Sequence, residues 1–282
     1  MATKTELLGA QIRRLVVEMS ERSRSGETGS SLSISDVLAV LYFNILRIDP
    51  KKPDDPKRDR FVLSKGHGAA ALYAVLALRG FFPKKLLLGH RVNGGVFHAH
   101  PSKGSAPGIE VSTGALGHGL SIGVGMAYAL KGTKSKVYVL IGDGECNEGS
   151  IWEAALSAGA LCLPNIVAII DENKFQGFGA SDENNPFDKS KQGSSFGWDT
   201  LRVDGHDTQA IEKAFRTTAK AKRPTVIIAD TVAGKGVPSI ENTLEEICDV
   251  VIEMVERLNN TWRTTKEDEE LQARFWELFP VD

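Results

Sequence analysis

The sequence is poor in cysteine, and the few cysteines that it has are widely spaced. Cys146, Cys162 and Cys248 are the three cysteines among 282 residues. Their spacing matches neither a disulfide framework nor a zinc-binding pattern. Cys146 lies inside a glycine-rich motif and the other two have apolar neighbours, so we expect all three to be reduced packing residues.

An excess of charge, a long apolar run and an apolar leader are also absent. The formal net charge is −2, with 25% charged and 41% hydrophobic residues, which gives no signal for a nucleic-acid partner. Apolar stretches such as 165–170 are far shorter than the roughly 20 residues that span a bilayer. The start, Met1 to Glu6, lacks the apolar stretch of a secretory signal. We therefore expect a cytoplasmic protein with no membrane span and no nucleic-acid partner.

Short apolar runs alternate with segments of helical periodicity. Helices are predicted at 7–23 and 35–47, and the glycine- and serine-rich stretch 23–33 between them suits a flexible loop over a ligand. Two short buried strands and one surface connection are predicted at 61–63, 226–229 and 51–59. The alternation indicates an α/β fold, a parallel sheet with helices on both faces. We expect residues 1–282 to form a single domain, with 243–282 as a helical C-terminal extension.

The most informative motif is Asp143, which lies between two glycines at the end of the apolar run 137–141. Asn173 follows thirty residues later at the end of a second apolar run, and 148–161 between them has helical periodicity. A strand, helix and strand of this length make parallel neighbours, with both polar residues at the carboxyl ends. Carboxylate and amide oxygens suit Mg²⁺ or Ca²⁺, and the glycines would let a diphosphate approach the backbone. The pattern predicts a metal and diphosphate site at that edge of the sheet.

This pattern resembles the thiamine diphosphate motif, and the wording from Gly142 to Gly149 resembles transketolases in particular. Further segments with the family's wording occur in the family's order, at 64–68, 100–101, 111–121, 203–207 and 234–237. The resemblance extends from about residue 10 to about residue 242. It implies that the α/β domain has the thiamine diphosphate-binding, or diphosphate-domain, fold.

The length of the chain adds an expectation about a partner. A complete transketolase carries three domains, so the chain looks like the amino-terminal part alone. The resemblance then implies a second subunit with the pyrimidine-binding and C-terminal domains, as in split transketolases, and a heterotetramer. In the family a glutamate of that partner activates the cofactor. Glu148 resembles the family's interface glutamate, although a carboxylate is also favoured at a helix start by the dipole.

The resemblance implies transfer of a two-carbon ketol unit from a ketose phosphate donor to an acceptor, with thiamine diphosphate as the electron sink. It implies that Mg²⁺, or Ca²⁺, is held by Asp143, Asn173 and the carbonyl of Phe175. It gives His67 and His100 catalytic positions, where they would donate to an oxyanion or move protons near neutral pH. The cofactor-binding residues that it implies are His67, Gly114, Ala115, Leu116, Asp143, Gly144 and Asn173.

Two departures from the family leave the substrate open. Glu27 stands where a substrate-contacting histidine is usual, and the segment after Val237 lacks a second expected histidine. The acceptor could accordingly be an aldose or a carrier-bound thioester arm. An α subunit of a 2-oxoacid dehydrogenase, which shares the cofactor motif, and a non-catalytic scaffolding subunit, which would keep the fold, remain as alternatives.

Several of these residues also have purely structural interpretations. Asp143 and Asn173 are residue types that are common in turns. His118 stands where transketolases usually have glutamine, so a cofactor contact and a packing role are both open. Lys235 can meet a phosphate or remain solvated. The histidines interpreted as turn, surface or packing residues are His90, His98 and His206.

Overall fold

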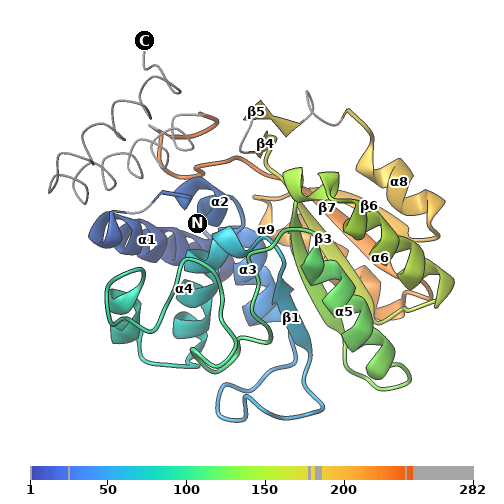
Figure 1. Ribbon diagram of the computed structural model, residues 1–282, viewed down its shortest axis with the longest axis horizontal. Helices are drawn as coiled ribbons and strands as arrows, with labels where there is room; N and C mark the ends of the chain where they lie inside the picture. The colour runs from blue at the N-terminus through green and yellow to red at the C-terminus, as the bar shows by residue number, and fades with distance from the viewer. Residues whose placement is uncertain (1, 25, 177–178, 182–185, 239, 244–282) are drawn as a thin grey trace, which may run out of the picture.

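The computed structural model describes residues 2–24, 26–176, 179–181, 186–238 and 240–243 (Figure 1). Within these residues, five parallel strands form one sheet in the order β1-β2-β3-β7-β6. The strands are β1 Arg60–Leu63, β2 Val137–Gly142, β3 Ile166–Glu172, β6 Asp199–Asp204 and β7 Thr225–Asp230. A short antiparallel pair, β4 Phe175–Gln176 and β5 Gly179–Ala180, follows β3. The parallel sheet is confirmed, and the strands predicted at 61–63 and 226–229 lie within β1 and β7.

Helices cover both faces of the sheet, as predicted. The helices are α1 Lys4–Ser23, α2 Thr28–Ser33, α3 Ser35–Val40, α4 Ala69–Arg79, α5 His118–Ala129, α6 Gly149–Ala160, α8 Lys189–Ser195 and α9 Thr208–Thr217. Short 3₁₀ turns are formed by Gly66–Gly68, Lys84–Gly89, Gly144–Asn147 and Thr218–Lys220. In Figure 1 the green helices α5 and α6 lie on one side of the sheet, and α1, α3 and α4 lie on the other.

Strand β2 shows how the sequence fills both faces. Its Val137, Val139 and Ile141 belong to a core shared with α5 and α6. Its Tyr138 and Leu140 belong to a second core, shared with α1, α3, α4 and α9. Every residue of β2 and of β3 is buried, which explains the apolar runs 137–141 and 166–170 without a polar alternation; β3 then ends in the buried Asp171 and Glu172.

The carboxyl ends of the strands gather the motifs at one edge of the sheet. The turn Gly66–Gly68 follows β1, the turn Gly144–Asn147 follows β2, and the pair β4 and β5 follows β3. Helix α2 lies over the same edge, at the top of Figure 1, where its Ser33 donates to Asp171 of β3 at 2.8 Å. This is the edge at which open α/β sheets bind ligands.

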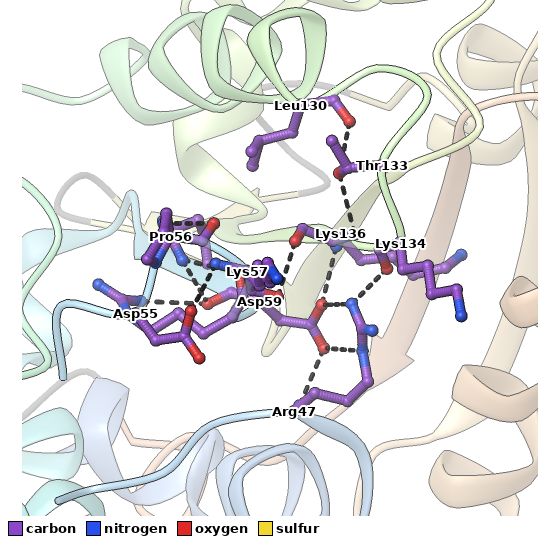
Figure 2. Close-up of polar contacts among 12 residues, drawn as sticks. Arg47, Asp55, Pro56, Lys57, Asp59, Leu130, Thr133, Lys134 and Lys136 are labelled. Carbon is purple, nitrogen blue, oxygen red and sulfur yellow. Dashed lines mark hydrogen bonds and ion pairs between the residues drawn. The ribbon is translucent and has the colours of Figure 1, made fainter. Parts of the chain in front are cut away.

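The opposite edge is closed by a buried carboxylate, Asp59, which precedes β1 and is 2% exposed. Figure 2 shows Asp59 between Arg47 and the chain at Lys136. The backbone N–H of Arg47 donates to Oδ2 at 2.9 Å, and its Nη2 donates to Oδ1 at 2.7 Å. The backbone N–H of Lys136, just before β2, also donates to Oδ1, at 2.8 Å. Asp59 therefore joins the chain after α3 to the first residues of β1 and β2.

Three predicted segments differ from the structure or extend beyond it. The loop predicted over 23–33 is wrong for its second half, because residues 28–33 form α2 and bury most of their side chains. The helix predicted over 35–47 is regular only to Val40 and continues as a π-helical turn at Leu41–Ile45. The extension predicted at 243–282 lies outside the described residues from 244 onward. Within the described part of the chain, no helix is both long and apolar enough to cross a membrane.

Candidate functional site

Asp143 and Asn173 lie at the carboxyl ends of the neighbouring strands β2 and β3, as the motif predicts. The strands pair with Gly142 opposite Asp171, and the backbone N–H of Asp143 donates to the carbonyl of Asp171 at 3.1 Å. The loop after β3 turns back over β2, because the backbone N–H of Lys174 donates to Oδ2 of Asp143 at 2.8 Å. Asp143 and Asn173 are 2% and 5% exposed. The structure thus brings the two predicted ligands to adjacent buried positions.

Phe175 belongs to the same turn as Asn173, and this turn and Asp143 supply the oxygen atoms that could bind a cation. The backbone N–H of Phe175 donates to Oδ1 of Asn173 at 3.0 Å. The side chains contribute one carboxylate and one carboxamide. In the described part of the chain, no group of three or more histidine, cysteine, aspartate or glutamate side chains is arranged to hold a metal. The donor set therefore suits a hard cation that keeps places for phosphate and water, such as Mg²⁺, and not a closed protein cage.

The electrostatics of Asp143 also fit a divalent cation. Burial raises the pKa of its carboxyl to about 6, and the charge of Asp171 adds to the rise. The backbone N–H groups of Gly144 and Lys174 donate to the carboxylate. Burial and the charge of Asp171 thus disfavour the ionised form of Asp143. A dication beside the carboxylate would stabilise that ionised form.

Glycines let backbone segments meet closely at this edge. Gly114 has a φ of 143°, and a Cβ there would lie 3.1 Å from Cγ of His100. A Cβ on Gly66 would lie 2.8 Å from the backbone nitrogen of Gly114, and a Cβ on Gly144 would lie 2.7 Å from the Cβ of Gln176. Only glycine fits these positions without a shift, and the packing suits presentation of backbone to a diphosphate. Beyond Gly114, Ala115 is exposed and Leu116 is half-buried.

His67 lies close enough to His100 for a charge on His100 to affect the pKa of His67. Burial, with the charges of Lys65 and His100, lowers the pKa of His67 to about 3. His67 is therefore neutral at physiological pH and can both donate and accept hydrogen bonds. A neutral imidazole suits the hydrogen-bonding role expected for His67, and its catalytic role stays a prediction. The backbone carbonyl of His100 accepts from the hydroxyl of Tyr73 at 3.1 Å.

A buried ion pair that the sequence analysis did not single out lies beside Asn173. Nζ of Lys65 is 2.6 Å from Oδ2 of Asp171, and the two side chains are 0% and 1% exposed. The same oxygen accepts from Nδ2 of Asn173 at 2.9 Å. Lys65 lies inside the motif at 64–68 and Asp171 lies two residues before Asn173, so the sequence did mark both residues as close to the predicted site. Their contact joins positions 106 residues apart, so spacing alone could not reveal it.

Glu145 is a second residue that the sequence analysis missed. Its Oε1 accepts from the hydroxyl of Ser64 and from the N–H of Gly117, the latter at 2.8 Å. Its Oε2 accepts from the N–H of Gly142 at 3.1 Å. Burial raises the pKa of Glu145. The carboxylate joins the loops after β1, at the end of β2 and before α5 into one unit.

His206 is more than a turn residue. Its Nδ1 lies 2.9 Å from Oδ2 of Asp36, and its Nε2 accepts from the N–H of Val232 at 2.9 Å. Because Nε2 accepts, Nδ1 carries the proton. Arg13 of α1 donates to both oxygens of Asp36, at 2.8 and 3.0 Å. This network holds the chain after β7 against α1 and α3.

Glu27 and Lys235, two charged residues whose roles the sequence left open, each form an ion pair. Glu27, which stands in place of an expected histidine, has its Oε2 3.5 Å from Nη1 of Arg91. Lys235, for which phosphate binding and solvation were both open, has its Nζ 3.8 Å from Oε1 of Glu241.

The remaining histidines and cysteines divide between packing and exposure. His118 begins α5 with an exposed side chain whose Nδ1 lies 2.9 Å from the carbonyl of Leu116. His90 is buried against Tyr73, which confirms a packing role. Cys146 is buried as predicted, but the prediction for Cys162 is wrong, because it is exposed after α6. His98 is exposed and Cys248 lies outside the described residues.

Comparison with known sequences gives matches over most of the chain. A family model described as transketolase, thiamine diphosphate binding domain, matches residues 4–249. One of the subunits of apulose-4-phosphate transketolase from Phocaeicola vulgatus is 41% identical over 266 residues, which cover 90% of this chain and 94% of the relative. The 6-deoxy-6-sulfo-D-fructose transketolase subunit SqwG of a Clostridium species is 43% identical over 237 residues, which cover 83% and 86%.

Solved structures give the same result for the fold. Transketolase from Campylobacter jejuni superposes with a TM-score of 0.82 at 31% identity, over 87% of this chain and 40% of that one. Transketolase from Leishmania mexicana superposes with a TM-score of 0.78 at 26% identity, over 99% of this chain and 48% of that one. The chain thus spans less than half the length of these solved enzymes. It belongs to the transketolase family of enzymes, as the amino-terminal, thiamine diphosphate-binding part.

Proposed function

We propose that this chain is the thiamine diphosphate- and Mg²⁺-binding subunit of a two-component transketolase. The enzyme would move a two-carbon ketol unit from a ketose phosphate donor to an acceptor. The observation that carries the proposal is the adjacent placement of Asp143 and Asn173 at the ends of β2 and β3, in a chain of this family. Their oxygens and the carbonyl of Phe175 would hold the cation, and the cation would hold the diphosphate. Ca²⁺ would fit the same oxygens.

The other residues of this edge would position the cofactor. When bound, thiamine diphosphate supplies the electron sink that lets the C2–C3 bond of a ketose break. His67, neutral at physiological pH, would hydrogen bond near the diphosphate. His100, packed on Gly114, would face the reacting carbon and donate to the oxygen on it. The residues that would line the cofactor are Gly114, Ala115, Leu116 and Gly144.

A second subunit would supply the pyrimidine-binding and C-terminal domains. The adjacent helices α5 and α6 support this, because they contain neither lysine nor arginine and a single carboxylate, Glu153. On their outer face Tyr128 is 58% exposed and Leu156 is 55% exposed, and exposed apolar patches mark protein–protein contacts. Glu148 is exposed at the N-cap of α6 and makes no capping hydrogen bond. We propose that the partner covers this α5–α6 face in a heterotetramer.

The names of the relatives bear on the donor. One relative is named for apulose 4-phosphate and another for 6-deoxy-6-sulfo-D-fructose, both sugars with an anionic group. A ketose with an anionic group remote from its carbonyl is therefore the donor class that we propose. Glu27 places a carboxylate, paired with Arg91, where a substrate-contacting histidine is usual in the family, so we propose a substrate that differs from that of enzymes with this histidine.

The test uses the chain produced together with the polypeptide encoded beside it. Calorimetry with thiamine diphosphate, with and without Mg²⁺, measures cofactor binding by the complex. Product analysis with fructose 6-phosphate and xylulose 5-phosphate then measures cleavage, for which an aldose phosphate shorter by two carbons is expected. Absence of Mg²⁺-dependent binding would overturn the proposal and favour a scaffolding subunit. Binding without cleavage of either sugar would exclude these two donors and leave cofactor binding by the complex intact.

A further inference from the structure

We propose that Asp171 is a positioning residue for the cation site. Held by the buried Lys65, its carboxylate fixes the carboxamide of Asn173 so that the amide oxygen is turned toward the cation. The inference rests on the proposed function, because that function makes Asn173 a cation ligand. Neither Asp171 nor Lys65 is itself assigned a contact with the cation or the cofactor.

The Asp171 carboxylate is bonded at both oxygens by donors from separate segments. Its Oδ2 accepts from Nζ of Lys65 at 2.6 Å and from Oγ of Ser33 at 2.8 Å. The same oxygen accepts from Nδ2 of Asn173 at 2.9 Å. Its Oδ1 accepts from the hydroxyl of Thr231, just after β7. A buried carboxylate with this set of partners cannot rotate without leaving polar groups unpaired.

Lys65 and Asp171 hold each other in place. The Lys65 side chain is fully buried, and besides Asp171 its Nζ donates to the carbonyl of Ser30 in α2 at 3.0 Å. A buried ammonium group without a charged partner is costly, and so is a buried carboxylate without one. The pair therefore keeps a charged acceptor at one fixed position beside Asn173.

The carboxamide of Asn173 has partners of opposite kinds on its two sides. A carboxylate can only accept, so Nδ2 must face Asp171. A backbone N–H can only donate, so Oδ1 must face Phe175, at 3.0 Å. Both contacts select the same orientation. The preceding N–H, of Lys174, donates to Oδ2 of Asp143. The two side chains proposed as cation ligands are thus bonded by the N–H groups of consecutive residues of one turn.

The experiment measures the Mg²⁺ concentration that half-saturates thiamine diphosphate binding by the two-subunit complex. Asp171→Asn should raise that concentration about tenfold or more, the effect typical of removing a partner that orients a metal ligand. Because this variant leaves Lys65 unpaired and could unfold, the double variant Lys65→Met with Asp171→Asn is measured as well. It removes both charges and should show the same weakening with a wild-type circular dichroism spectrum.

A mutant cycle with Asn173→Ala separates positioning from general damage. If Asp171 acts through Asn173, adding Asp171→Asn to the Asn173→Ala variant should change the half-saturating Mg²⁺ concentration by less than about twofold. An undiminished effect in that background would overturn the inference. Thr231→Val is the matched control, since it removes a donor from the other oxygen of Asp171. It should lower thermal stability while the half-saturating concentration stays within about twofold of wild type.

The outcomes distinguish the inference from the function on which it rests. A wild-type complex without Mg²⁺-dependent cofactor binding overturns both. A wild-type complex that binds, together with folded variants of Asp171 that bind equally well, overturns the positioning role alone. Equal weakening by Thr231→Val and Asp171→Asn would also overturn it, because both changes would then act only through general packing.

Discussion

The backbone N–H of Lys174 donates to the carboxylate of Asp143, although the two residues follow different strands. Lys174 adopts a left-handed φ of 71°, uncommon for a residue with a side chain, and this conformation belongs to the turn that carries the loop back over the end of β2. The contact joins residues 31 positions apart in the sequence and places the turn that contains Asn173 beside Asp143.

The first prediction concerns the cation ligands. Asp143→Asn should lower Mg²⁺-dependent affinity for thiamine diphosphate by at least about a hundredfold, because the amide offers no charge to the cation. Calorimetry on the two-subunit complex measures the change. Asp54→Asn, at an exposed position before β1, is the matched control and should bind like wild type. Equal affinity in the Asp143 variant and this control would remove Asp143 from the metal site.

The second prediction concerns pH and the stability of the chain without cation. Burial raises the pKa of Asp143 from 3.8 to about 6, so between these values the unfolded chain binds fewer protons at this group than the folded chain does. The contribution of Asp143 to stability should therefore fall as pH rises from about 4 to about 6.

Urea unfolding of wild type and Asp143→Asn at pH 4 to 8 measures this effect as a difference. The free energy of unfolding of the variant should rise relative to that of wild type by up to about 3 kcal/mol between pH 4 and about pH 6. From there to pH 8 the difference should stay level. His67 and His90, whose pKa values burial lowers to about 3 and about 4, are common to both proteins. A constant difference at all pH values would contradict the raised pKa.

The third prediction concerns the backbone at Gly114. Gly114→Ala should weaken cofactor binding and slow ketol transfer, because the new Cβ would press on the His100 ring and an L-residue is strained at a φ of 143°. We expect a loss of about tenfold or more in kcat/KM, measured by product formation. Gly132→Ala is the control: its φ is 83°, but a Cβ there meets nothing within 4 Å. Equal losses in both variants would show that backbone strain, and not the contact with His100, causes the loss.

The fourth prediction concerns the association of the two subunits. Tyr128→Asp and Leu156→Asp should each weaken that association about tenfold or more, because they place a charge in the proposed apolar contact. Both side chains are more than half exposed, so the isolated chain should keep its thermal stability. Analytical ultracentrifugation of the mixed subunits measures the binding. Leu88→Asp, at a side chain equally exposed elsewhere, should associate normally; weakening by this control as well would dissociate the effect from the α5–α6 face.

The parts of the fold that could be predicted are those in which a local pattern decides the structure. The apolar runs of β2 and β3 and the periodicity of α6 place Asp143 and Asn173 at one edge without further information. Helix α2 shows the limit. Its six residues include one glycine and three serines, which have low intrinsic helix propensity, and the helix is held by burial and by the bond from Ser33 to Asp171.

The buried charges of the site illustrate the same limit. Lys65 and Glu145 carry side chains that normally remain in solvent, and each is buried because partners from distant segments satisfy it. Composition and spacing cannot disclose such partners, since they come together only when the strands are in register. A lysine or glutamate inside a motif of small residues nevertheless indicates that its charged group can be buried and bonded to other groups of the protein.

The hydrogen bonds of Asp59 with Arg47 and Lys136, seen in Figure 2, lie far from the candidate site and serve the fold alone. They fasten the amino ends of β1 and β2, whereas the candidate cation ligands follow the carboxyl ends of β2 and β3. A substitution at Asp59 should alter how much folded protein a cell accumulates, while the sugars on which the enzyme acts stay the same. At the ligand end, by contrast, buried groups such as Glu145 and the Lys65–Asp171 pair serve both the fold and the candidate site, so a substitution there should alter stability and binding together.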